Sequence, residues 1–213
     1  MKPTFVLQAY AMWIGLCVLS SVVHAAALRL AAVRVRAFRL FAGGTLARVA
    51  LGGVRFELGW VPMGTSVLYD VPAFWRRPAW TQVAVTLAGP LALLPCAAAV
   101  LGPSSAWHHF LAGFVQLPLG ALHPLSTGWE LIARLHDLPL ASVTGVLAAK
   151  LAASAFLPLG GSATAQAIRA FVGPVNEGDE RSWAARFPVL SALVMILIMA
   201  GWGVAAVSYV VLT

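Results

Sequence analysis

The stretch Phe5–Leu28 (FVLQAYAMWIGLCVLSSVVHAAAL) decides the fold, because its 24 residues include no charged side chain. A helix needs about 20 predominantly apolar residues to cross the hydrocarbon core of a bilayer. The stretch is therefore predicted to be a membrane-spanning helix. An alternative interpretation is a secretory signal peptide ending at His24-Ala25-Ala26-Ala27, but the apolar core of such peptides has only about 7–15 residues. We expect it to be retained as a membrane anchor.

Three further apolar runs are long enough to cross a membrane. They are Val83–Leu101, Leu138–Leu159 with the single charge of Lys150, and Pro188–Leu212. A shorter run, Phe110–Leu122, falls below the length that spans a bilayer, so it is expected to be re-entrant or interfacial. The sequence therefore predicts about four membrane-spanning helices.

The composition agrees with a membrane protein, since 61% of the residues are apolar and only 10% are charged. Soluble domains carry about 25% charged residues, and disordered chains are rich in charge and poor in apolar residues. The chain is therefore predicted to be one all-α integral membrane domain over residues 1–213. Its two cysteines, Cys17 and Cys96, lie in apolar runs and cannot form a disulfide framework.

The 14 basic residues exceed the 7 acidic ones and give a net charge of +7. In a membrane protein such an excess usually marks the cytoplasmic loops, so no nucleic-acid partner is expected. Eight arginines lie between the first two predicted spans: Arg29, Arg34, Arg36, Arg39, Arg48, Arg55, Arg76 and Arg77. The loop before the last span adds Arg169, Arg181 and Arg186. Both loops are predicted to be cytoplasmic and both termini outside. The short loops favour a bacterial cytoplasmic (inner) membrane.

The first cytoplasmic loop carries a β-rich segment over residues 33–70. Val33–Leu40 (VRVRAFRL) alternates apolar and basic residues, which is typical of a half-exposed strand. Ala47–Leu58 (ARVALGGVRFEL) repeats the alternation around Gly52-Gly53, a hairpin signal. We predict a small antiparallel sheet next to the membrane. A basic amphipathic surface that binds anionic lipid headgroups is a compatible interpretation.

A series of short motifs stands in a recognisable order. They are SSVVH at Ser20–His24, LGWVPMGTSVL at Leu58–Leu68, LAGPLALL at Leu87–Leu94, PLSTGWELIA at Pro124–Ala133, SAFLPLGG at Ser154–Gly161 and GPVNE at Gly173–Glu177. In order and spacing the series resembles the site-2 protease family of intramembrane zinc metalloproteases. The resemblance covers nearly the whole chain, without the PDZ domain that many members insert after the Gly-Pro span.

The resemblance places the family's catalytic positions on residues that cannot perform the chemistry. Ser20 and Ser21 stand where HExxH has its first histidine and its general base, and only His24 retains a ligand. Leu159 stands where the family has the aspartate that is the third ligand. A zinc peptidase needs three protein ligands and an open position for water. We therefore expect no zinc, no other cofactor and no peptide hydrolysis.

The resemblance also implies where a client would bind. The loop with Trp60, Pro62 and Gly64 and the step at Gly89-Pro90 are the candidates for a substrate groove. The favoured function is a pseudoprotease that binds transmembrane or juxtamembrane segments of client proteins, or regulates an active partner complex. The alternatives are a divergent active metallopeptidase in regulated intramembrane proteolysis, and a small transporter or structural membrane subunit.

Other polar residues leave further interpretations open. Ser20 or Ser21 with His24 could form an activated serine nucleophile, although small polar residues in membrane helices more often support packing. A new metal site would have to use the remaining histidines: His108, His109, His123 and His136. Lys150 is either functional or neutralised by a partner such as Glu130.

Overall fold

The computed structural model describes residues 2–157, 162–172 and 183–212. Two of the described helices are long and apolar enough to cross a membrane: α1 (Lys2–Leu30), over Pro3–Leu30, and α3 (Ala79–Leu101). Shorter apolar stretches are α6 (Leu140–Phe156) and Ile196–Val211, which lies within α8 (Trp183–Val211). The mostly helical architecture is as predicted, and the four-span arrangement stays a prediction.

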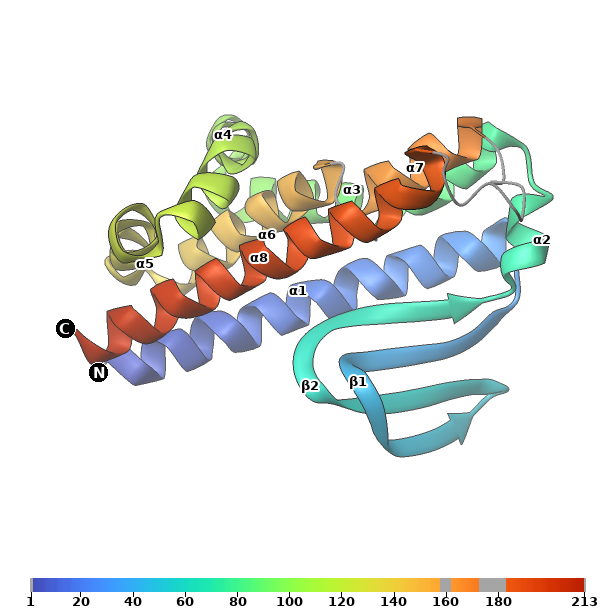
Figure 1. Ribbon diagram of the computed structural model, residues 1–213, viewed down its shortest axis with the longest axis horizontal. Coiled ribbons are helices and arrows are strands. Elements are labelled where there is room, and N and C mark those ends of the chain that lie inside the picture. The colour runs from blue at the N-terminus through green and yellow to red at the C-terminus, as the bar shows by residue number, and fades with distance from the viewer. Residues whose placement is uncertain (1, 158–161, 173–182, 213) are drawn as a thin grey trace.

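The long helices run lengthwise beside one another. Figure 1 shows α1, α6 and α8 along the long axis, with the N-terminus and the C-terminus at one end. Their outer faces carry large apolar side chains, among them Leu7 at 68% exposure, Leu197 at 69% and Val207 at 64%. Such extended apolar surfaces are unusual on soluble monomers, so this surface is suited to lipid.

The segment around Phe110–Leu122 forms a longer helix than the sequence predicted. α4 (Pro103–Leu122) has 20 residues and follows α3 directly, because Gly102 with a φ of 81° turns the chain between them. It packs against α8, where Trp202 donates its indole N–H to the Leu117 carbonyl oxygen at 3.0 Å, while Trp107, Val115 and Leu122 are exposed. Its expected re-entrant or interfacial position stays a prediction. The sequence analysis did not predict the first turns of this helix, because His108-His109 interrupts the hydrophobic pattern.

Short helices connect these elements. α2 (Val71–Trp75) begins at Asp70, whose carboxylate accepts a hydrogen bond from the Ala73 backbone N–H at 3.2 Å. The π-helix η1 (Pro124–Gly128) and α5 (Trp129–His136) link α4 to α6, and α7 (Ala163–Val172) follows α6.

The sheet has two long antiparallel strands, β1 (Val35–Leu51) and β2 (Val54–Tyr69). They join at Gly52-Gly53, where both φ angles are positive, as the predicted hairpin requires. Both strands bend, so that the first half of β1 lies between the two halves of β2. Arg39 accordingly has two register partners, Ser66 on one side and Glu57 on the other.

The sheet lies along the flank of α1 and does not simply follow its end (Figure 1). The Tyr10 hydroxyl donates to the Pro62 carbonyl oxygen near the start of α1, and Leu28 near its end is buried with Val33 and Val35. At 1.5 Å per residue, these contacts extend over about 27 Å of the helix. The sheet therefore lies beside much of the length of α1, and its predicted position next to the membrane stays a prediction.

Candidate functional site

A cavity of about 410 Å³ lies where five elements meet. Its lining comes from α1, β2, α3, α6 and α7 and is rich in hydroxyl groups, and among the described residues it includes no side chain of Asp, Glu, Lys or Arg. The lining residues are Cys17, Ser20, Ser21, His24, Gly64, Thr65, Ser66, Val67, Tyr69, Thr86, Pro90, Leu93, Leu151, Ser154, Ala155, Ser162, Ala163 and Gln166. Neutral polar groups in a mostly apolar hollow are suited to an uncharged ligand.

One face of α1 forms a wall of the cavity. Cys17, Ser20, Ser21 and His24 follow the spacing that places residues on one helix face. The Ser21 and Thr65 hydroxyl oxygens are 2.6 Å apart, and Thr65 also donates to the Cys17 carbonyl oxygen at 2.9 Å. These hydrogen bonds fix β2 against α1.

The approach of α3 to α1 depends on a glycine. A Cβ at Gly89 would lie only 2.5 Å from the Ser20 carbonyl oxygen. Gly89 therefore holds the two helices close together, while the next residue, Pro90, lines the cavity.

The opposite side of the cavity comes from the chain on both sides of Leu159. Ser154 lies near the end of α6, and Ser162 caps α7 by accepting a hydrogen bond from the Ala165 backbone N–H at 3.1 Å. Leu159 itself lies outside the described residues. Ser154 and Ser162, which flank the segment with Leu159, share the cavity lining with Ser20 and His24.

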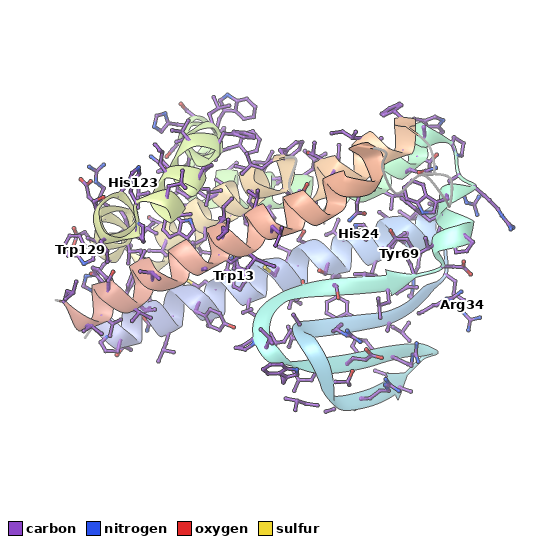
Figure 2. All side chains as sticks on the ribbon, in the orientation of Figure 1. Trp13, His24, Arg34, Tyr69, His123 and Trp129 are labelled. Atoms are coloured by element: carbon purple, nitrogen blue, oxygen red, sulfur yellow. The ribbon has the colours of Figure 1, made fainter. Side chains whose placement is uncertain are left out.

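Three polar groups in the lining are available to a ligand. Within the described part of the chain, the Ser20 and Ser66 hydroxyl groups and the His24 imidazole make no hydrogen bond. Figure 2 shows His24 on α1 facing Tyr69 at the end of β2, and their ring centroids are 6.1 Å apart. These groups can donate hydrogen bonds to, or accept them from, the backbone of a bound peptide.

The lining does not fit a zinc ion. It offers one imidazole and one thiol, from His24 and Cys17, and no carboxylate, whereas catalytic zinc sites have three His, Asp, Glu or Cys ligands. No group of three such residues lies together anywhere in the described ranges. The absence of zinc remains a prediction.

A serine nucleophile is also not formed among the described residues. No hydrogen bond joins Ser20 or Ser21 to His24, and Ser21 pairs with Thr65 instead. The other histidines do not assemble a site either: His108 and His109 contact each other, and His136 packs against Phe5 and Tyr209.

The groove candidates occupy two places. Gly64 and Pro90 line the cavity, and Gly89 lies directly against Ser20. Trp60 and Pro62 are at the bend of the sheet and outside the lining. The Trp60 indole packs against Gly43 and is 63% exposed.

Several lining residues had no signal in the sequence. Thr86, Ser162 and Gln166 are single polar residues outside the quoted motifs, and only the packing of α3 and α7 brings them together. A helical-face analysis of each apolar run could have found Thr86 beside the Gly89-Pro90 step, but not its partners across the cavity.

Beside the cavity, the sheet concentrates the charge. Glu57 is buried, with its side chain 3% exposed, and binds Arg39 at 2.6 Å and Arg48 at 3.3 Å. The hydrogen bond from Arg39, together with nearby arginine charges, lowers the pKa of Glu57. The hydrogen bond from the Ala73 backbone, followed by that from Arg36, lowers the pKa of Asp70.

Lys150 lies away from the cavity lining, between α6 and α4. Its ammonium group donates to the Gln116 side-chain oxygen. The suggested partner, Glu130, instead pairs with Arg134 at 2.6 Å.

Comparison of the chain with protein-family models, curated proteins and solved structures found no match. The site-2 protease resemblance therefore stands on the motifs alone.

Proposed function

We propose that the chain is a site-2 protease-like integral membrane protein that binds a client segment in the cavity without cleaving it. The observation that carries this proposal is the meeting of Ser20, Ser21 and His24 with Ser154 and Ser162 in one cavity. Ser20, Ser21, His24 and Ser154 belong to the two motifs that correspond to the metal-holding motifs of active family members, and Ser162 directly follows the second motif.

The membrane arrangement in this proposal uses α1, α3, α6 and α8 as four spans. The apolar outer faces of α1 and α8 support burial in lipid, and both termini lie at one end of the helices, as an even number of crossings requires (Figure 1). The arginine-rich end with the α1–β1 connection faces the cytoplasm of a bacterial inner membrane under the positive-inside rule, where it contacts anionic headgroups.

The edge of β2 supports the binding of an extended segment. Residues 65–67 pair with β1 along one edge only, and residues 64–67 line the cavity. An unpaired strand edge can take a further strand by main-chain hydrogen bonds. Inside a membrane an unwound segment must have its backbone groups satisfied, and the Ser20 and Ser66 hydroxyls can do so.

The residues at the metal-ligand and general-base positions argue against hydrolysis. Two of the three ligand positions and the general-base position carry Ser20, Leu159 and Ser21, none of which suits its role. The client is therefore held and released intact, either for sequestration or for delivery to an active partner complex.

A synthetic membrane-spanning peptide tests this function. The probe is a leucine-rich helix with a central Asn-Gly pair, which unwinds easily, and its control is the same helix without the pair. Binding is measured by fluorescence energy transfer in vesicles that contain the purified protein. We expect the interrupted peptide to bind more tightly, to remain uncleaved and to keep binding in the presence of a zinc chelator.

Matched variants locate the binding. Ser66→Trp fills the cavity and should weaken binding about tenfold or more, whereas Leu68→Trp, on the same strand but outside the lining, should leave it unchanged. Equal binding of the two peptides would refute client binding at this site. One equivalent of zinc together with peptide cleavage would instead establish a divergent metallopeptidase.

A further inference from the structure

Lys150 lies at the middle of the helical bundle. Its neighbours Ala149 and Ala153 are buried in one cluster with Leu16, which is the midpoint of the 29-residue α1. If α1 crosses the bilayer as proposed above, Lys150 lies near the centre of the hydrocarbon core, about 15 Å from either headgroup region.

The ammonium group is held at this depth by a neutral partner. It donates to Gln116 of α4, so the side chain does not extend toward an end of α6. The two helices are close at this point, since a Cβ at Gly113 would lie 2.7 Å from the Ala153 Cβ. Lys150 remains partly exposed at the seam between α4 and α6.

No carboxylate in the described part of the chain neutralises Lys150. Glu57, Asp70 and Glu130 each pair with an arginine, and Asp137, the fourth carboxylate of the described residues, forms no ion pair with Lys150. A charged side chain at the bilayer centre is costly, and such residues almost always pair with another charge or polar group. The Gln116 amide supplies a dipole but no opposite charge.

We propose that Lys150 is the docking point for a partner membrane helix that carries a carboxylate. The partner lies along the α4–α6 seam and places an Asp or Glu side chain against Lys150, with Gln116 as a second hydrogen-bonding group. An anionic lipid does not fit this role, because its headgroup stays at the surface while Gln116 holds the ammonium at depth. The inference rests on the proposed membrane placement, but it concerns a surface separate from the cavity.

The test uses a leucine-rich synthetic helix with one central Glu, and the same helix with Gln in its place. Association with the full-length protein is measured by fluorescence energy transfer in phosphatidylcholine vesicles. A polar contact between membrane helices contributes about 1–2 kcal/mol, so the Glu helix should associate about five- to thirtyfold more tightly than the Gln helix. Lys150→Met should remove this preference, and Lys150→Arg should retain it.

Equal association of the two helices with the wild-type protein would overturn the inference. So would a preference for Glu that appears only in the triple variant E177Q/D179N/E180Q, because the chain would then supply its own carboxylate. Vesicle flotation and alkaline extraction separate this failure from that of the proposed function. A protein that floats with vesicles and resists extraction, yet does not distinguish the helices, contradicts the docking proposal alone. A protein that is extracted contradicts both.

Discussion

In the sheet, charged side chains meet in pairs, whereas in the helical bundle uncharged small residues bring backbones together. Glu57 lies between Arg39 and Arg48 because the bent strands pair it with both. In the bundle, Gly89 lies against the Ser20 backbone, and Gly113 lies against Ala153. The sheet therefore depends on ion pairs and the bundle on close backbone packing, although both regions contact α1.

The difference shows how the molecule accommodates polar groups beside apolar helices. Ion pairs contribute little to the free energy of unfolding when they are exposed to water. Glu57, however, is buried between its arginines, which are themselves partly exposed. The cavity lies between the two regions, and the described residues that line it include no Asp, Glu, Lys or Arg. Each region can be perturbed separately, which permits the following predictions.

The largest effect is expected from Gly89→Ala. The added methyl group would lie 2.5 Å from the Ser20 carbonyl oxygen, so α1 and α3 must separate. Overpacking of this kind lowers the free energy of unfolding by about 1–3 kcal/mol. Thermal unfolding of the protein in detergent micelles should show the loss.

Gly203→Ala is the matched control, because a Cβ at this position of α8 meets no atom within 4 Å. The melting temperature of this variant should equal or slightly exceed that of the wild type, since Ala favours helix more than Gly. An equal loss in both variants would show that the close approach of Gly89 to Ser20 does not decide the effect.

The bundle was the more predictable region. The apolar runs predicted α1 and α3 to within a few residues of their ends, because a charge-free run of that length has few other stable structures. They missed the start of α4, where His108-His109 breaks the pattern although the backbone stays helical. An apolar run identifies a helix by its apolar surroundings. It therefore does not detect the part of a helix whose polar residues face outward.

The sheet was predicted in kind but not in extent. Alternation in Val33–Leu40 indicated a strand, but residues 41–46 (FAGGTL) do not alternate basic and apolar residues, so the bend was not visible. In the cavity, Ser20, Ser21 and His24 lie on one face of α1, which their spacing in a helix accounts for. Their neighbours Ser154 and Ser162 come from another part of the chain, and local patterns contain no information on that contact.

A smaller and more local effect is expected from Glu57→Gln. Arg39 and Arg48 lose the charge that holds them, so the sheet should open more often and be cleaved faster by trypsin at neutral pH. Glu130→Gln serves as the control, because its pair with Arg134 is largely exposed and contributes little. Equal cleavage rates in the two variants would contradict a structural role for Glu57.

The same contact predicts a pH dependence. Because the folded protein lowers the pKa of Glu57 below its ordinary value of 4.5, the stabilisation is fully present above about pH 4.5 and is lost as the pH falls through the lowered pKa. Proteolysis by pepsin between pH 4.5 and 2 should accelerate in the wild type. The profile of Glu57→Gln should be flatter over this range.

The smallest effect is expected where the two regions meet, from Thr65→Val. The change removes the contact with Ser21 and the hydrogen bond to the Cys17 carbonyl oxygen. The Cys17 carbonyl remains within α1, and only the half-buried Ser21 hydroxyl loses its partner, so the free energy of unfolding should fall by about 1 kcal/mol. Ser66→Ala is the control, because that hydroxyl makes no hydrogen bond among the described residues, and it should leave stability unchanged.

A double-mutant cycle with Ser21→Ala tests whether this contact couples the sheet to α1. If the two hydroxyl groups bind each other, the double variant should lose less stability than the sum of the single variants. Additive losses in chemical unfolding experiments would mean that each hydroxyl acts alone. The sheet would then be held against α1 by the apolar contacts around Leu28 and by the bond between Tyr10 and Pro62, and the wall of the cavity would depend on those distant contacts.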